Sequence, residues 1–207
     1  MSDEQKKILI PRLEGYHCFA CGTENPIGLK MSFYCLGRTV RSDLTLSEKH
    51  VGWENIVHGG VISTVLDEIM GWAVIAFKRE FFVTRKIEVR YLRPVTVHTP
   101  VTAIAEIDPD LSGAPPAGAG GSFNNAPSRD FINPSSPGRA GGFQEQGIER
   151  GCRTTAMLQT AEGVPLATAR AEVVFLPEKR IKTLPIDYVR EMNALFENIK
   201  VLLDNNR

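Results

Sequence analysis

The longest apolar stretch of the chain, residues 58–77, places hydrophobic side chains at positions that fall all around a helix. It opens with a His-Gly-Gly turn and reads HGGVISTVLDEIMGWAVIAF. A helix that is apolar on every side either crosses a membrane or lies in the middle of a domain. Two adjacent carboxylates, Asp67 and Glu68, argue against a membrane span, because a charge at mid-bilayer is costly. We therefore predict a buried central helix.

Alternating apolar and polar positions on both sides of this helix predict an antiparallel sheet. The predicted strands are residues 29–36, 39–46, 82–93, 100–107, 152–161 and 165–175, with tight turns at Gly37-Arg38 and Glu162-Gly163. The alternation slips at Arg85. Residues 186–203 have apolar side chains at helical spacing, which predicts an amphipathic helix that faces the core. This order indicates an α+β fold, with one sheet wrapped around the central helix and an uncovered edge or face that self-association would cover.

The domain organisation follows from composition. We expect a flexible lead-in at residues 1–14, one domain at 15–176, and a linker with a C-terminal helix at 177–207. Residues 108–151 hold nine glycines and six prolines, too few apolar side chains to offset the entropy of ordering them. This segment is predicted to be a loosely packed insertion at a hairpin tip.

Overall charge excludes some partners. Lys and Arg number 24, as do Asp and Glu, so nothing favours a nucleic-acid or membrane surface held by bulk charge. The N-terminal residues show no export signal, and we expect a cytoplasmic protein with reduced thiols.

Four cysteines raise the question of metal. Cys18-x-x-Cys21-Gly is half of a zinc knuckle or a redox pair, but no second Cys-x-x-Cys follows. His17, Cys35 and His50 would complete a ligand set only at irregular spacing. We therefore expect a turn whose cysteines act as small buried hydrophobic residues, with no metal and no cofactor.

The two helix carboxylates need separate interpretations. A buried carboxylate requires a partner or a function, because an unpaired charge is costly to desolvate. Adjacent helix positions point about 100° apart, so Asp67 and Glu68 face different surroundings. From the residues alone, Asp67 is either catalytic or a structural acid that pairs with Arg85 or Arg90.

At this point the chain resembles a known family. HGGVISTVLDEIMGWAV followed by VTRKIEVRYLRPV resembles the hotdog-fold acyl-CoA thioesterases of the 4-hydroxybenzoyl-CoA and phenylacetate-degradation type. The upstream HCFACGTENPIGLKM is similar to the lead-in of one branch of that family. The likeness covers residues 15–175 apart from the insertion. It implies a hotdog fold, a homodimer or homotetramer, and active sites at the subunit interface.

The resemblance also implies the reaction, which is hydrolysis of an acyl-CoA to the free acid and coenzyme A. By position, Asp67 matches the catalytic acid, as general base or nucleophile. Gly59 matches the residue whose backbone N–H polarises the thioester oxygen, and His58 the residue that shapes the turn. Thr84 matches a Ser or Thr near the attacking water, contributed by the neighbouring subunit. Glu68 is expected to be structural or a dimer contact.

Substrate contacts are less sharply indicated. The candidates are Gly60, Asn55, Trp53, Arg90 and Arg93. Trp53 would line the acyl pocket or simply cover the loop. Arg90 and Arg93 would bind phosphates of coenzyme A or be exposed strand charges.

One position departs from the family pattern. Six residues before His58, where the family often has Asn or Gln, this chain has Gly52, and Asn55 or His50 would have to substitute. This departure and the insertion leave an alternative open, a non-catalytic protein that binds acyl-CoA or another small ligand. A dehydratase is a third alternative, disfavoured because no fitting His/Asp or His/Glu arrangement is present.

Overall fold

The computed structural model describes residues 6–108 and 150–206. Its main sheet has the order β1-β2-β3-β7-β8-β9-β6, and every neighbouring pair is antiparallel. The strands of this sheet are β1 (Ile8–Ile10), β2 (Phe33–Leu36), β3 (Thr39–Thr45), β6 (Phe82–Tyr91), β7 (Pro100–Ile107), β8 (Gly151–Thr160) and β9 (Pro165–Phe175). A separate two-stranded sheet, β4 (Val51–Trp53) with β5 (Ile56–Val57), follows the short 3-10 helix η1 (Glu48–His50).

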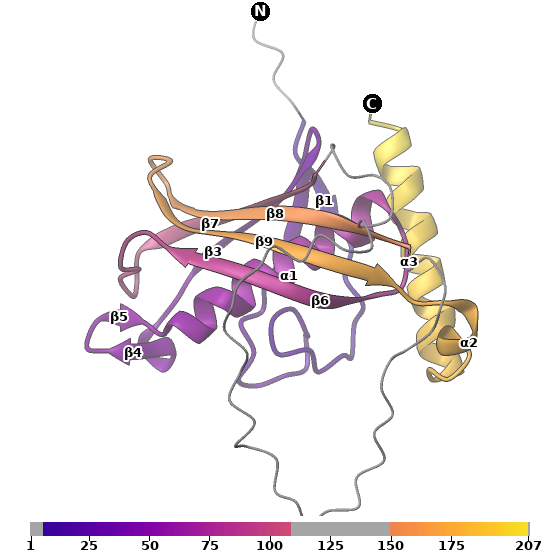
Figure 1. Cartoon of the computed structure of the whole chain (residues 1–207), viewed down its shortest axis with the longest axis horizontal. Coiled ribbons are helices and arrows are strands. Elements are labelled where there is room, and N and C mark those ends of the chain that lie inside the picture. Colours follow the sequence, from indigo (N-terminus) through magenta and orange to yellow (C-terminus); the bar gives the residue numbers. More distant parts are fainter. Residues whose placement is uncertain (1–5, 109–149, 207) are drawn as a thin grey trace, which may run out of the picture.

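The helix α1 (Gly59–Phe77) lies along one face of the main sheet, as Figure 1 shows. By length and apolar composition it could cross a membrane, but nine of its residues are buried in the core formed with the sheet. The helix α3 (Ile186–Asp204) packs at the end of this layer and buries Met192, Leu195, Phe196, Ile199 and Leu203. The short helix α2 (Glu178–Ile181) precedes it. The predicted α+β architecture, with a sheet around a central helix and a C-terminal amphipathic helix, is confirmed.

Several expectations for the local structure were wrong. The lead-in at residues 1–14 contains β1, whose residue Ile10 is buried and which pairs with β2. Residues 29–32, predicted to start a strand, lie outside β2. The loop before the central helix contains η1, β4 and β5, and the linker contains α2. These elements have two to four residues each, too few to show a period. Residues 109–149 of the predicted insertion lie outside the described residues.

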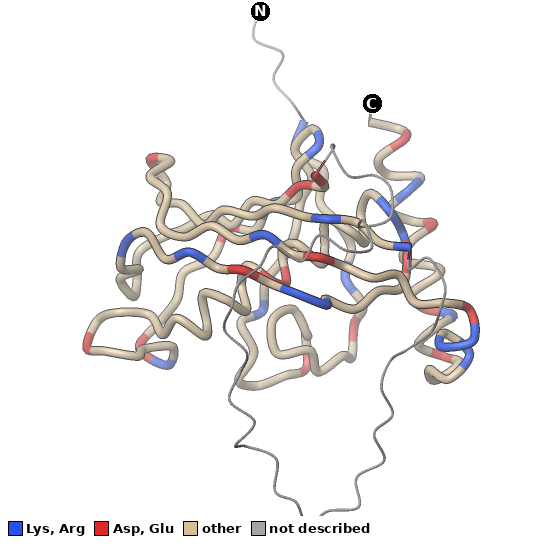
Figure 2. Tube along the Cα trace, in the orientation of Figure 1, with Lys and Arg blue, Asp and Glu red and all other residues tan. Residues whose placement is uncertain are grey.

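The strand β6 is one edge of the main sheet, and its only sheet partner within residues 6–108 and 150–206 is β9. The register shifts between Thr84 and Lys86, a bulge that accounts for the slip in the sequence pattern at Arg85. Three large apolar side chains on this edge strand are exposed, namely Val83, Ile87 and Tyr91. Charges of both signs are interspersed along β6 and the rest of the sheet (Figure 2). A ten-residue edge strand with exposed apolar side chains among its charges is a natural site for pairing with another chain.

Candidate active site

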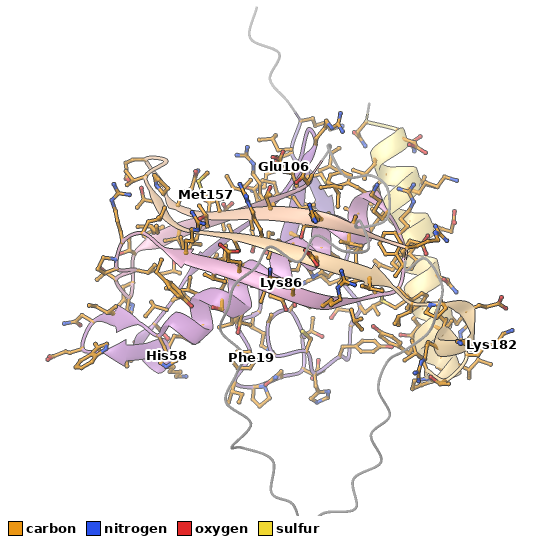
Figure 3. All side chains as sticks on the ribbon, viewed as in Figure 1. Phe19, His58, Lys86, Glu106, Met157 and Lys182 are labelled. Atoms are coloured by element: carbon orange, nitrogen blue, oxygen red, sulfur yellow. The ribbon has the colours of Figure 1, made fainter. Side chains whose placement is uncertain are left out.

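The start of α1 is built by a capping histidine. His58 is the N-cap residue, and its Nδ1 accepts a hydrogen bond of 2.9 Å from the backbone N–H of Gly60. Its own backbone N–H donates to the carbonyl of His50 at 2.8 Å, which holds the turn against the preceding loop. His58 is labelled at this helix end in Figure 3. The predicted turn-shaping role of His58 therefore has a geometric basis.

The backbone N–H of Gly59 has no hydrogen-bond partner among the described residues. Gly59 is the first residue of α1, where N–H groups lack intrahelical partners and carry partial positive charge. Such a group can stabilise an oxyanion if a carbonyl oxygen comes within hydrogen-bond distance. The sequence assigned this role to the same residue.

Asp67 lies two turns further along α1 and is paired with β6. The Thr84 hydroxyl donates a hydrogen bond of 3.0 Å to Asp67 Oδ1. The two residues therefore lie together in one chain, and the expectation that Thr84 reaches the site of a neighbouring subunit stays a prediction. Asp67 is also exposed in the single chain, whereas we predicted a buried carboxylate. The reason is that its side of the helix faces the sheet edge, where no further strand from residues 6–108 or 150–206 covers it.

Tyr91 ties the beginning of α1 to the far end of β6. Its hydroxyl donates to the Gly59 carbonyl at 3.0 Å and lies 2.6 Å from the Ser63 hydroxyl. Tyr91 lies in the VTRKIEVRYLRPV stretch that carries the family resemblance, but this contact could not be predicted from it. The contact fixes the carbonyl side of the Gly59 peptide and leaves its N–H free.

Gly52 lies directly against the capping histidine. A Cβ built at Gly52 would come within 3.0 to 3.2 Å of three His58 atoms. A larger side chain at this position would press on the turn, so His58 would have to shift by a few tenths of an ångström to admit it. Two residues, His50 and Asn55, were expected to replace the missing amide. His50 is occupied by a local contact, because its Nδ1 accepts a hydrogen bond of 3.0 Å from the Ser47 backbone N–H. Asn55 is exposed with a φ of 62°, and its carbonyl accepts from the Val97 N–H.

The remaining substrate candidates are on the surface. Trp53 in β4 is 81 % exposed. Arg90 forms an ion pair with Glu88 at 3.2 Å, and Arg93 donates to the Pro165 carbonyl at 2.7 Å. No described hydrogen bond or ion pair joins either arginine to Asp67 or Gly59, so the single chain does not assemble them into one site.

The second helix carboxylate, Glu68, is half-buried, whereas Asp67 is exposed. Burial raises its pKa to about 7. Its Oε1 accepts a hydrogen bond of 2.9 Å from the Trp72 indole, and the Cys18 sulfur lies 3.8 Å from Oε2. The Cys21 thiol hydrogen-bonds to Cys18, which lowers the pKa of Cys18 to about 5 and, with burial, raises that of Cys21. Cys18 is exposed and Cys21 is only half-buried, so the prediction that both cysteines are buried was wrong.

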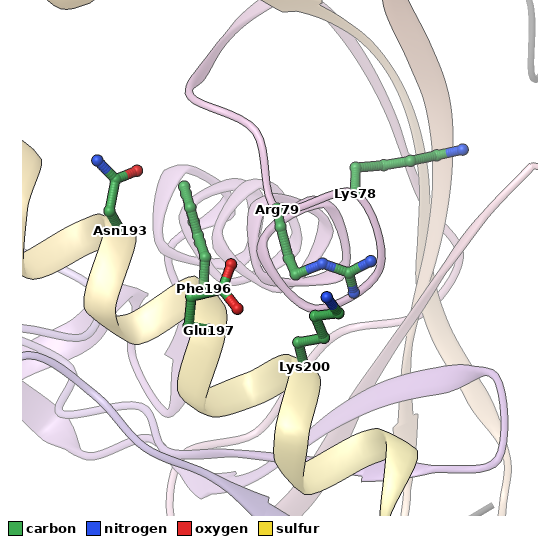
Figure 4. A pocket seen from close by; sticks show the side chains of 6 residues that line it. All are labelled: Lys78, Arg79, Asn193, Phe196, Glu197 and Lys200. Carbon is green, nitrogen blue, oxygen red and sulfur yellow. The ribbon is translucent and has the colours of Figure 1, made fainter.

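A hollow of about 380 Å³ lies elsewhere, between the end of α1 and α3 (Figure 4). It is lined by Lys78, Arg79, Asn193, Phe196, Glu197 and Lys200. Lys78 follows Asp67 by eleven residues, about 16 Å along a helix. This hollow is therefore separate from the carboxylate and from the helix start.

A large antiparallel sheet wrapped around one long central helix is the arrangement of the hotdog fold. The Thioesterase superfamily model matches residues 54–108 of this chain, which span β5, α1, β6 and β7. This match and the shared fold confirm the resemblance to hotdog-fold thioesterases, and they support thioester hydrolysis at the level of the superfamily.

Three solved structures illustrate what the chain is similar to, and the first of them supports the fold. The chain is similar to a thioesterase superfamily protein with 21 % identity and a TM-score of 0.53, over 78 % of this chain and 60 % of that one. Zebra fish thioesterase superfamily member 2 is 14 % identical over 75 % of this chain and 88 % of that one, with a TM-score of 0.49. The E. coli PaaI protein from the phenylacetic acid degradation operon is 12 % identical over 72 % and 81 %, with a TM-score of 0.48. No curated protein matches.

Proposed function

We propose that this protein hydrolyses acyl-CoA thioesters in a site shared by two copies of the chain. The observation that carries the proposal is a pair of groups on α1. Asp67 accepts a hydrogen bond from Thr84 of β6, and the Gly59 N–H at the helix start has no partner among the described residues. The first group can activate water and the second can receive an oxyanion. Together they supply the two functions that thioester hydrolysis needs.

The spacing of these groups is the reason for a second copy. Asp67 follows Gly59 by eight residues in one helix, which separates them by about 12 Å along its axis. A single thioester carbonyl needs its oxyanion donor and its water-activating base within about 3 Å of the reacting atoms. One chain therefore offers half a site at each end of this helix segment.

The strand β6 supplies a way to join the halves. Asp67 contacts Thr84 near one end of β6, and Gly59 contacts Tyr91 at the other. If the exposed β6 edges of two chains pair antiparallel about their middle, the Thr84 end of one chain meets the Tyr91 end of the other. Asp67 of each subunit then faces Gly59 of its neighbour, and the dimer has two complete sites.

The proposed chemistry uses only groups of the chain and water. Asp67, oriented by Thr84, takes a proton from water as the oxygen adds to the thioester carbon. The Gly59 N–H of the neighbouring subunit stabilises the oxyanion, and collapse breaks the C–S bond. The coenzyme A thiolate takes up a proton, and the free acid leaves. Direct attack by the Asp67 carboxylate, followed by hydrolysis of the anhydride, is the alternative route.

The test is thiol release from a panel of aryl-, short-, medium- and long-chain acyl-CoAs. We expect Asp67→Ala to abolish turnover while the circular dichroism spectrum stays unchanged. Glu162→Ala, which removes an exposed carboxylate at the β8–β9 turn, is the control and should keep full activity. Wild-type turnover in Asp67→Ala would overturn the assignment of the base.

Gly52 favours one competing function. Without an amide side chain at this position, the chain would bind acyl-CoA and release no thiol. Binding by calorimetry without turnover for any member of the panel would establish this non-catalytic alternative. We further propose that the protein acts in the cytoplasm as a homodimer or a homotetramer built from such dimers.

A further inference from the structure

Two segments distant in sequence bring three metal-ligand groups together beside α1. The Cys18 and Cys21 sulfurs and a Glu68 carboxylate oxygen all lie within 4.8 Å of one another. The Cys18 sulfur is 3.8 and 4.0 Å from the two Glu68 oxygens. With zinc–sulfur bonds of about 2.3 Å and zinc–oxygen bonds of about 2.0 Å, tetrahedral ligand atoms are about 3.5 to 3.8 Å apart. The cluster therefore needs only a small contraction to hold such an ion.

The cysteine loop has the backbone of a metal knuckle. The loop presents both cysteine sulfurs on the side that faces Glu68. The Gly22 N–H closes the turn by donating to the Cys18 carbonyl at 2.9 Å. A Cβ on Gly22 would clash with the Cys18 backbone and the Tyr16 carbonyl. A glycine directly after Cys21 is therefore needed for this tight loop to form.

The loop is held in place from outside. Arg12 donates to the Met31 carbonyl at 2.6 Å, and Lys30 Nζ donates to the Thr23 carbonyl at 2.5 Å and the Gly22 carbonyl at 3.2 Å. Tyr16 hydrogen-bonds to Glu191 of α3 at 2.9 Å. A ligand pair anchored in this way loses little entropy when it binds an ion.

Glu68 is oriented toward the sulfurs by its neighbour one turn on. The Trp72 indole that donates to Glu68 Oε1 is 5 % exposed and stacks on Phe33 with ring centroids 4.4 Å apart. The second oxygen, Oε2, faces the Cys18 sulfur at 3.8 Å. A hydrogen bond from outside the ligand set that fixes a ligating carboxylate is a usual feature of metal sites.

We propose that Cys18, Cys21 and Glu68 form a binding site for a divalent zinc-type ion. Two sulfurs and one carboxylate select a borderline-soft ion over Mg²⁺ or Ca²⁺, which prefer oxygen ligands. Both thiols release a proton when they bind. Because Cys18 is exposed, the fourth tetrahedral position is open to water. The ion would fasten the N-terminal loop to the central helix, independently of the thioesterase chemistry proposed for Asp67.

The test is cobalt binding to the untagged, reduced full chain. We expect one Co²⁺ per chain, with the near-ultraviolet thiolate charge-transfer band and the visible bands of a tetrahedral ion, and displacement by Zn²⁺. Cys21→Ser should lose the charge-transfer band. Glu68→Gln should keep a thiolate band and bind at least about tenfold more weakly. Asp67→Asn, the adjacent carboxylate on another face of the helix, is the matched control and should bind as the wild type does.

Thiol reactivity gives a second measurement that does not depend on cobalt spectra. Zn²⁺ at a concentration that just saturates the wild type should slow modification of the exposed Cys18 in the wild type and slow it markedly less in Glu68→Gln. No charge-transfer band in the reduced wild type, or a band that persists in Cys21→Ser, would overturn the proposal. Equal weakening by Asp67→Asn and Glu68→Gln would overturn the assignment of Glu68.

Discussion

Mixing two inactive variants tests whether the active site is shared between subunits. Asp67→Asn removes the base, and Gly59→Pro removes the N–H at the first helical position. Proline is tolerated there, because its missing N–H has no intrahelical partner and His58 already has the φ of −62° and ψ of 134° that a residue before proline adopts. A Cβ at Gly59 would make van der Waals contacts of 3.4 Å with Tyr91, so the ring has room.

Because the two groups are about 12 Å apart along α1, each variant loses one group from each of two different sites. Loss of one oxyanion donor lowers kcat by about 10²- to 10³-fold, and loss of the base by about 10²- to 10⁴-fold. When the two variants associate at random, half of the dimers are mixed. Each mixed dimer has one site with both groups intact and one with neither. The mixture should therefore recover about a quarter of the wild-type activity.

The assay is thiol release by co-refolded or co-expressed chains with distinct tags. Once the mixed dimer is isolated by its two tags, its activity should rise to about half of the wild-type value, because one of its two sites is intact. Asp67→Asn mixed with Thr84→Val is the matched control. These two residues lie in the same half-site of one chain, so every site of that mixed dimer keeps a defect. No recovery in the Asp67/Gly59 mixture, or equal recovery in both mixtures, would refute the shared site.

Three further predictions concern the acid, the edge strand and the loop. In metal-free protein, the raised Glu68 pKa of about 7 means that its contribution to stability is present below pH 4.5 and lost as the pH rises through 7. The urea-unfolding free energy of the wild type relative to Glu68→Gln should fall by about 3 kcal/mol between pH 4 and pH 8, and a pH-independent difference would contradict this. Ile87→Asp, which charges the exposed edge of β6, should give monomers in sedimentation and no thiol release; a fully active dimer would exclude pairing through this strand. Gly52→Ala should lower kcat/KM and leave Tm nearly unchanged, because the added Cβ presses on His58 in the turn before α1. Unchanged kinetics would show that the turn adapts freely.

Elements that follow from local periodicity could be predicted well from the sequence. The predicted helix at 58–77 differs by one residue from α1, and the slip at Arg85 marks a real bulge. The His-Gly-Gly turn and the acid nine residues after its histidine identified the groups at the helix start and two turns on. The site roles themselves stay predictions, because they depend on chemistry that the fold alone does not test.

What could not be predicted depends on which surfaces meet. We expected Asp67 to be buried, but its exposure depends on where the sheet ends, and that edge is set by strand order. Glu68 joins the Cys18 loop across 50 residues of sequence, and no spacing rule for metal ligands covers a carboxylate on a distant helix. Tyr91 and Gly59 meet because β6 runs beside α1, a contact that periodicity does not encode.

The indole that orients Glu68 also gives the protein an internal optical reporter. The chain has two tryptophans, Trp72 at 5 % exposure and Trp53 at 81 %. A water-soluble quencher should extinguish the emission of Trp53 and spare that of Trp72. The surviving fluorescence then comes from a ring bonded to Glu68 at 2.9 Å. Ion binding or protonation at that carboxylate can therefore be followed in real time in the unmodified protein.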